Sequence, residues 1–290
     1  MKKFLFFLLK ILVIILAFAC VLDVVYSNLF FYSKNRSKIG YIYNSKPQEF
    51  DVVILGSSRS NNHFVTQMFT DQGLKTFNFG MQGSKLFESD LVLKLLLEKK
   101  NKIKNVIIDV DVNLRSDKKS EAVILKFLPY LHDSEAIKKH LMIMPGYDFL
   151  YYIPFYRYVK YETKIGVREM FFCSINKKNK ELDFGGYSAL ENSNTTLTEN
   201  LNVNPIRNEY YEEIKSICKR NNINLIAIMT PMCENAIGMN YFEKVKKLYP
   251  EIHNYENVVV DNKYFSSCGH MNDTGARIFT TRILKDFFKK

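Results

Sequence analysis

Two short polar segments of the sequence contain side chains that can carry out nucleophilic catalysis. A Gly-Ser-Ser segment ends at Ser58, directly after an apolar run, and His270 stands in a Gly-His-Met-Asn segment near the C-terminus. A serine hydroxyl attacks an acyl carbon when a histidine takes its proton and nearby N–H groups hold the oxyanion. Glycine amides and a carboxamide for that oxyanion hole are present in two further segments, 78–83 and 111–113. Together the four segments predict acyl transfer, provided that the fold brings them to one place.

Apolar runs with the length of buried strands precede these segments. The runs that we expect to form strands are 51–55, 75–79, 106–110, 224–229 and 258–261. Helical patterns separate them, and this alternation predicts βαβ units with a parallel sheet covered by helices on both faces. We therefore expect a three-layer α/β/α fold with a flavodoxin-like, five-stranded sheet. Ligands of such sheets bind outside the carboxyl ends of the strands, where we expect the four polar segments to converge.

Three helices of this fold are indicated by their sequence. An apolar pattern covers 84–100, Asn204-Pro205 resembles a helix start with Pro at the first helical position, and Asn272 can cap a final amphipathic helix. Between about 116 and 203 the alternation is absent, and we expect a helical insertion there. Its aromatic cluster at 147–161 is predicted to fill the core of this insertion; a lid, an acceptor-binding cap and a membrane-facing surface are the alternatives.

The N-terminus predicts a membrane anchor. Two lysines precede an apolar run from Phe4 to Leu22, which only Lys10 interrupts. That length is just sufficient to cross a bilayer as a helix. A cleaved signal peptide is the alternative, because residues 17–19 fit a small-x-small cleavage site, and a lipid-modified Cys20 is a weaker variant.

We expect four parts along the chain. Residues 1–28 form the anchor, 29–50 a juxtamembrane linker and 51–290 the catalytic domain, which contains the insertion at 116–203. Positive charges flank the apolar run on both sides, so the expected orientation rests on the ability of large C-terminal domains to translocate. We predict a single-pass protein of the inner (cytoplasmic) membrane with an extracytoplasmic, periplasmic catalytic domain.

Charge and cysteine content exclude several classes of protein. The formal net charge is +11, but the lysines are scattered and no compact motif of a DNA or RNA module is present, so no nucleic-acid partner is expected. None of the five cysteines forms a C-x-x-C pair, which leaves zinc and redox motifs unsupported. An odd, widely spaced set of cysteines also predicts no disulfide framework. We expect neither a metal nor a diffusible cofactor.

The four polar segments resemble the conserved blocks of SGNH (GDSL-like) hydrolases. Gly56-Ser57-Ser58 is similar to the first block, Asn78-x-Gly80-x-x-Gly83 to the second, Asp111-Val112-Asn113 to the third and Gly269-His270-Met271-Asn272 to the last. The resemblance covers the chain from Asp51 to the C-terminus, apart from the middle segment. The Gly-Ser-Ser variant is similar to that of membrane-anchored proteins acting on envelope polymers, such as those of teichoic acid D-alanylation and alginate O-acetylation.

The resemblance implies a role for several residues. Ser58 would be the nucleophile and His270 the base, while the Ser58 N–H, the Gly83 N–H and the Asn113 side chain would hold the oxyanion. Apart from the resemblance, Arg59, His63, Asn62 and Gln82 are candidates for binding an anionic group of the substrate near the site, and the alternative is that they are ordinary polar residues.

The chain departs from the family in two places. Ser267 stands where the family has the Asp that orients the histidine, and Asp111 replaces a glycine of the third block. The orienting group is therefore expected to be Ser267 or a more distant acid such as Asp261.

The resulting hypothesis is a serine-dependent acyl ester hydrolase or O-acyltransferase acting on a cell-envelope polysaccharide or glycolipid. Its expected partners are the membrane, an acylated glycan or lipid-linked substrate, and a membrane acyltransferase. The alternative is a catalytically inactive protein of the same fold that binds or assembles components of envelope glycan export or modification. A nucleotide-binding protein ranks last, because no phosphate-cradling glycine loop is present.

Overall fold

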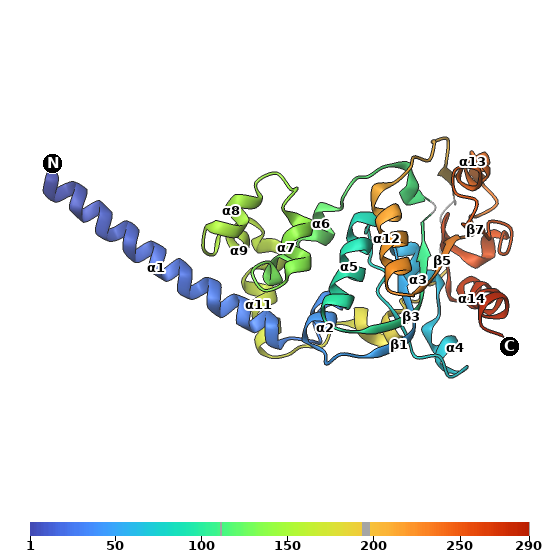
Figure 1. Ribbon diagram of the computed structural model, residues 1–290, viewed down its shortest axis with the longest axis horizontal. Coiled ribbons are helices and arrows are strands. Elements are labelled where there is room, and N and C mark those ends of the chain that lie inside the picture. Colours follow the sequence, from blue (N-terminus) through green and yellow to red (C-terminus); the bar gives the residue numbers. More distant parts are fainter. Residues whose placement is uncertain (111, 193–197, 290) are drawn as a thin grey trace. The chain divides into compact units, whose positions relative to one another are not determined.

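In the computed structural model, which describes residues 1–110, 112–192 and 198–289, a parallel sheet organises the larger part of the chain (Figure 1). Its strand order is β2-β1-β3-β5-β7, which is the flavodoxin-like order. The strands are β1 Glu49–Leu55, β2 Thr76–Asn78, β3 Lys102–Asp109, β5 Asn224–Met229 and β7 His253–Asn254. The predicted fold class is confirmed, because all five strands pair in parallel and β1, β3 and β5 are nearly continuous apolar runs at their buried ends.

The fifth strand lies in a different place from the one predicted. Residues 258–261 form a loop, which follows a turn closed by the hydrogen bond from the Val258 N–H to the Tyr255 carbonyl. The edge strand is instead β7, which pairs only with the end of β5, through Ile228 and Met229. Its two residues, His253 and Asn254, are exposed, so no apolar pattern marks it in the sequence.

Helices cover both faces of the sheet (Figure 1). On one side α5 Leu86–Glu98 packs against α12 Glu209–Arg220. On the other side α14 Asp273–Phe287 packs against α3 Ser58–His63 and α4 Thr66–Thr70. The remaining helix of this part is α13 Asn240–Leu248. Two short strand pairs complete it, β4 Glu199–Asn200 with β6 Ala236–Ile237 and β8 Phe265–Ser267 with β9 His270–Met271.

The helix starts show which capping predictions were right. The Asn272 side chain accepts from the Gly275 N–H and caps α14, as predicted. The predicted start at Asn204-Pro205 was wrong, because α12 begins at Glu209. The Asn208 side chain accepts from the N–H groups of Tyr210 and Tyr211, and this cap decides the start.

The chain folds into two compact units. The sheet unit consists of Lys46–Val123 and Lys180–Lys290, and the helical unit of Met1–Ser45 and Ile124–Asn179. Helices of the helical unit are α1 Lys2–Tyr32, α2 Lys38–Asn44, α7 Glu135–Leu141, α8 Tyr147–Tyr152, α9 Tyr156–Lys160, α10 Glu162–Ile165 and α11 Val167–Ser174, while α6 Glu121–Ile124 lies where the chain enters this unit. The helical unit thus combines the N-terminal segment with residues from within the predicted insertion.

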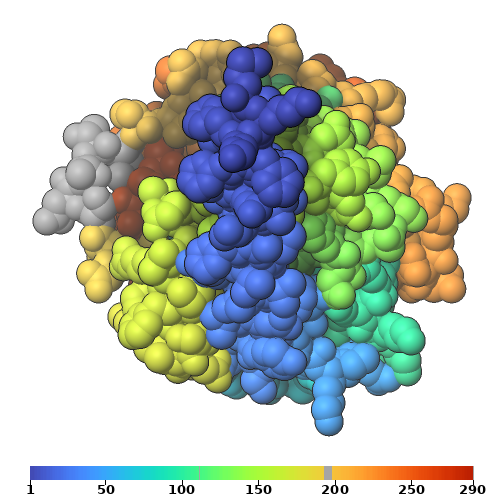
Figure 2. Space-filling model, turned by 90° about the vertical axis from the view of Figure 1, so that its left-hand side faces the viewer, coloured from blue at the N-terminus to red at the C-terminus, as the bar shows by residue number. Residues whose placement is uncertain are grey.

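The N-terminal helix is longer than the predicted anchor of residues 1–28. Of the described residues, α1 alone is a helix long and apolar enough to cross a membrane, and its most apolar stretch is exposed throughout. It continues to Tyr32, and the segment predicted as a linker contains α2, which Ser37 caps by accepting from the Gly40 N–H. Within the helical unit, α11 and the turn Leu128–Tyr130 pack along α1. Figure 2 shows α1 in blue, with residues of the later helices on either side of it.

A buried ion pair attaches the C-terminal part of α1 to the helical unit. Arg157, at 1% exposure, donates through one Nη to Asp23 Oδ1 at 2.7 Å and to Ser27 Oγ at 2.9 Å. The other carboxylate oxygen of Asp23 accepts from the Phe155 N–H at 2.7 Å, and Ser27 also bonds the Tyr158 hydroxyl. A buried charge is tolerated when it is paired and hydrogen-bonded in this way.

We predict that Arg157→Leu destabilises the helical unit by about 3 to 5 kcal/mol, because it leaves the Asp23 carboxylate buried without its cation. Lys160→Leu is the matched control, since Lys160 is an exposed cation of the same helix. Thermal unfolding followed by circular dichroism in detergent measures both variants. Equal unfolding temperatures for the two variants would contradict the assignment of Arg157 as the essential cation.

Candidate active site

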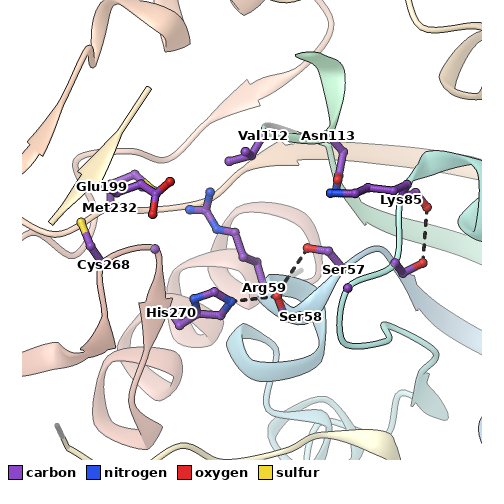
Figure 3. A pocket seen from close by; sticks show the side chains of 13 residues that line it. Ser57, Ser58, Arg59, Lys85, Val112, Asn113, Glu199, Met232, Cys268 and His270 are labelled. Carbon is purple, nitrogen blue, oxygen red and sulfur yellow. Dashed lines mark hydrogen bonds between the residues drawn. The ribbon is translucent and has the colours of Figure 1, made fainter. Parts of the chain in front are cut away.

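A hollow of about 150 Å³ lies in the sheet unit, beyond the carboxyl ends of β1 and β3 (Figure 3). The residues that line it are Ser57, Ser58, Arg59, Gly83, Ser84, Lys85, Val112, Asn113, Glu199, Met232, Cys268, Gly269 and His270. All four polar segments singled out in the sequence therefore contribute to one pocket. Its position agrees with the rule that open parallel sheets bind ligands at this edge.

Ser58 is the first residue of α3, at a tight turn after β1. Gly56 makes this turn with φ +132°, and a side chain there would place a Cβ only 2.3 Å from the Ser60 Oγ. Ser57 then caps α3 by accepting from the Arg59 N–H, and its hydroxyl donates to Asp109 Oδ2 at 3.2 Å. The turn thereby directs the Ser58 hydroxyl into the pocket.

His270 lies next to the Ser58 hydroxyl. The distance between Ser58 Oγ and His270 Nε2 is 2.8 Å, although 212 residues separate the two in the chain. On the other side of the ring, Ser267 Oγ lies 3.1 Å from Nδ1. When Nε2 accepts a hydrogen bond from the Ser58 hydroxyl, Nδ1 carries the ring proton and donates a hydrogen bond to Ser267 Oγ. The structure therefore places Ser267 in contact with the imidazole.

A disulfide and a buried histidine support the hairpin that carries His270. Cys268 is bonded to Cys233, 35 residues earlier in the chain, which ties the β8–β9 hairpin to the segment after β5. His63, at the end of α3, is completely buried, and its Nε2 accepts from the Met271 N–H at 3.1 Å. Through His63, the helix that begins with Ser58 is hydrogen-bonded to the strand that contains His270.

The residues expected to hold an oxyanion line the same pocket. Gly83 adopts φ +74°, which permits a tight turn before α5, and Asn113 is buried in the 3₁₀ turn Val112–Arg115. The Asn78 side chain stabilises the preceding segment by accepting from the Gly80 N–H and donating to the Ser60 carbonyl. Asp111 lies outside the described residues.

Three charged residues surround the pocket. Arg59 is buried and donates through one Nη to the carbonyls of Thr230 and Pro231, at 2.9 and 2.7 Å. Figure 3 shows the Glu199 carboxylate facing the Arg59 guanidinium. Lys85 is half-buried at the start of α5, and its pKa is lowered by burial and then by the charges of Arg115 and Lys118.

Glu88 lies below the loop that precedes α5. Its two carboxylate oxygens accept from the N–H groups of Lys85 and Ser120, both at 2.7 Å. Burial raises the pKa of Glu88 to about 7, although both hydrogen bonds favour the charged form. This buried carboxyl holds the Gly83–Lys85 side of the pocket to residue 120.

Two of the residues considered in the sequence lie away from the pocket lining. Asp261 caps the 3₁₀ turn Asn262–Tyr264 and pairs with Lys263 Nζ at 2.6 Å, so the structure does not present it as the acid of this site. Gln82 is exposed and does not line the hollow. Ser58, His270, Ser267, Gly83, Asn113 and Arg59 are brought together.

Sequence reasoning missed the disulfide, the role of His63 and the presence of Glu199. The pairing of cysteines cannot be deduced from their spacing alone. His63 was considered as an anion-binding or ordinary polar residue, yet it is buried beneath the site. Glu199 lies in the short strand β4, within the segment 116–203 that was expected to be a helical insertion.

Comparison of the sequence with models of known protein families and with curated proteins finds no match to either.

We predict that the free energy of unfolding decreases on acidification because His63 is buried in its neutral form. Burial, followed by the charges of Arg59 and His270, holds the pKa of His63 well below its usual value near 6.5. Below about pH 6.5 the unfolded chain binds a proton that the folded chain excludes, so the free energy of unfolding falls by up to about 1.4 kcal/mol per pH unit.

Urea unfolding at pH 7.5 and pH 5.5 measures this loss. His63→Gln, which keeps an acceptor for the Met271 N–H, should lose less stability between the two pH values than the wild type. His253→Gln, at an exposed imidazole, is the matched control. Parallel pH profiles for the wild type and His63→Gln would refute the prediction.

Proposed function

We propose that the protein is a serine-dependent acyl ester hydrolase or O-acyltransferase that acts on a cell-envelope polysaccharide or glycolipid. The observation that carries this proposal is the 2.8 Å contact between Ser58 Oγ and His270 Nε2 inside a pocket. The motif resemblance to SGNH hydrolases supports the same chemistry, with the same serine and histidine in the leading roles.

The proposed reaction has two steps. His270 Nε2 takes the Ser58 proton while Ser58 Oγ attacks the acyl carbonyl, and the Ser58 N–H, the Gly83 N–H and Asn113 hold the oxyanion. Collapse of the tetrahedral intermediate breaks the ester bond, and His270 gives its proton to the leaving alkoxide. Water or a sugar hydroxyl, activated by His270, then attacks the acylated Ser58 and releases the acid or the new ester.

Ser267 gives this proposed site a weaker base than a carboxylate would. A neutral hydroxyl can accept a hydrogen bond from a protonated Nδ1, and in that tautomer the other ring nitrogen, Nε2, can act as the base. It stabilises the imidazolium less than a carboxylate, because hydrogen bonds to charged groups are stronger. The site is therefore suited to slow turnover of an activated acyl donor.

An extracytoplasmic location is supported by two features of the chain. The α1 helix can anchor the protein as a single span, and the disulfide between Cys233 and Cys268 requires an oxidising compartment to persist. We therefore place the catalytic domain outside the inner membrane, where envelope polymers are modified.

A basic hollow of about 490 Å³ supports an anionic acceptor. Lys85 lines both this hollow and the pocket of Ser58, and the remaining lining residues of the hollow are Arg115, Ser116, Lys118, Val203 and Asn204. Within the part of the chain that the structure describes, no carboxylate forms an ion pair with Arg115 or Lys118. Carboxylate or phosphate groups of a polymer would neutralise these three cations next to the nucleophile.

A non-catalytic binding or assembly protein is the second candidate function. The observation that favours it is Ser267, because a hydroxyl replaces the carboxylate that normally activates the histidine. The same basic hollow would then serve to hold a glycan.

We predict that a fluorophosphonate probe labels the wild-type protein and leaves Ser58→Ala and His270→Ala unlabelled. Ser216→Ala, outside the pocket on α12, should label like the wild type.

Ser267→Asp should label about tenfold faster than the wild type, because a charged hydrogen-bond partner for the imidazole is worth roughly 1.4 kcal/mol more than a neutral one. Labelling of Ser58→Ala would refute the assignment of the nucleophile, whereas a folded but inert wild type would favour the binding protein.

We predict that the double variant Arg115→Glu/Lys118→Glu binds polygalacturonate about tenfold more weakly than the wild type, because it reverses two cations of the basic hollow. Lys219→Glu changes an exposed lysine outside this hollow and is the matched control. Binding measured by calorimetry, with neutral dextran as the reference polymer, tests the prediction. Equal affinities for the double variant and the control would exclude this hollow as an anion site.

A further inference from the structure

The end of the apolar run in α1 is attached to the α8–α9 segment of the helical unit. The run from Phe4 to Leu22 is 19 residues long, about 28 Å as a helix, which matches a hydrocarbon thickness of about 30 Å. The next residue, Asp23, forms the buried pair with Arg157 and accepts from the Phe155 N–H. A charged pair is costly in the hydrocarbon core, so a span that ends at Asp23 would place the α8–α9 segment at the bilayer boundary.

Large apolar side chains are exposed on the helices around this point. On α11, Val167 and Phe171 are exposed, and Ile175 directly after the helix continues their row. Spacings of four residues place these three on one side of the helix. Around α8 and α9 the exposed apolar side chains are Phe149, Tyr152, Ile153 and Val159. Exposed apolar side chains gathered in this way indicate a surface that contacts an apolar partner.

These helices lie beside α1 on the face from which it projects. In Figure 2, residues of 140–180 flank the blue helix on both sides. The bond from the Phe155 N–H to Asp23 holds the α8–α9 segment at the end of the span, and α11 packs against α1 further along the chain, where Glu169 pairs with Arg36. The exposed apolar side chains of α8 and α9 therefore lie near the point where α1 reaches the bilayer boundary, and those of α11 lie on the same side of the span's end as the helical unit.

The charges of this segment fit an anionic lipid surface. Residues 124–179 contain nine Lys or Arg against five Asp or Glu. Several of these cations lie over aromatic rings, as Lys138 does over Tyr151 and Lys160 over Tyr156. Aromatic rings and lysines whose stems lie along apolar surface are typical of the membrane–water interface.

We propose that α8, α9 and α11 form a second membrane contact, in which their exposed apolar side chains enter the headgroup region of the bilayer around α1. The expected partner of this surface is lipid, because the surface continues directly from the span and carries residue types that are typical of the membrane–water interface. This contact fixes the helical unit against the membrane surface, which a single span followed by a flexible linker would not do. It is independent of the acyl-transfer chemistry.

Tryptophan fluorescence tests this proposal in the full-length protein, because the natural chain contains no Trp. The probes are Phe149→Trp, Tyr152→Trp and Phe171→Trp, each reconstituted in vesicles of phosphatidylglycerol and phosphatidylcholine. Phe18→Trp reports on the span, and Ile278→Trp on α14 is the exposed control outside the apolar surface. Lipids brominated at shallow or deep acyl-chain positions quench the emission according to depth.

We expect shallow bromines to quench the three probes, with at least about half the quenching that the span probe shows, since interfacial helices bury their apolar face only about 5 to 10 Å deep. Deep bromines should quench Phe18→Trp most strongly, and Ile278→Trp should stay unquenched. Unquenched emission from Phe149→Trp, Tyr152→Trp and Phe171→Trp, beside a quenched Phe18→Trp, would overturn the proposal and indicate a protein partner for this surface. Equal quenching of Ile278→Trp would also overturn it, as would an unquenched Phe18→Trp.

Discussion

The parallel pairing of β1 with β2 and β3 is the constraint on which the candidate site depends. Because the three strands run in the same direction, the segments that follow them emerge at one edge of the sheet. Ser58 follows β1, Gly83 follows β2 and Asn113 follows β3, so the proposed nucleophile and the proposed oxyanion donors line one pocket although they are far apart in the sequence. The histidine is the one member of the set that the sheet does not position.

His270 depends instead on contacts outside the sheet. Its hairpin is joined to the segment after β5 by the disulfide, to α3 by the hydrogen bond from the Met271 N–H to His63, and to α14 by the cap that Asn272 provides. These contacts determine where the imidazole lies, and Ser267 Oγ lies beside its Nδ1. A hydroxyl at this position stabilises a charged imidazole less than a carboxylate would, because hydrogen bonds between charged groups are stronger.

Each of the two units contains buried ionisable side chains. In the helical unit the Asp23–Arg157 pair marks the end of the apolar span and attaches it to the α8–α9 segment. In the sheet unit Glu88 is buried beneath the loop that carries Gly83, and its pKa near 7 reflects the cost of that burial. In both arrangements hydrogen bonds to the buried carboxylate offset part of the cost of removing it from water.

The amino-acid sequence by itself determined four strands of the sheet, an N-terminal helix apolar enough to cross a membrane and the four polar segments, because buried strands and membrane helices are apolar over a characteristic length and parallel strands share one ligand-binding edge. Only the tertiary structure decided the distances on which chemistry depends. The contact of Ser58 with His270 joins residues 212 positions apart, and no local pattern specifies such a contact. The pairing of Cys233 with Cys268, the burial of His63, the exposed edge strand β7 and the cap at Asn208 were equally decided by packing. Each depends on which neighbours the fold supplies, and those neighbours are distant in the chain.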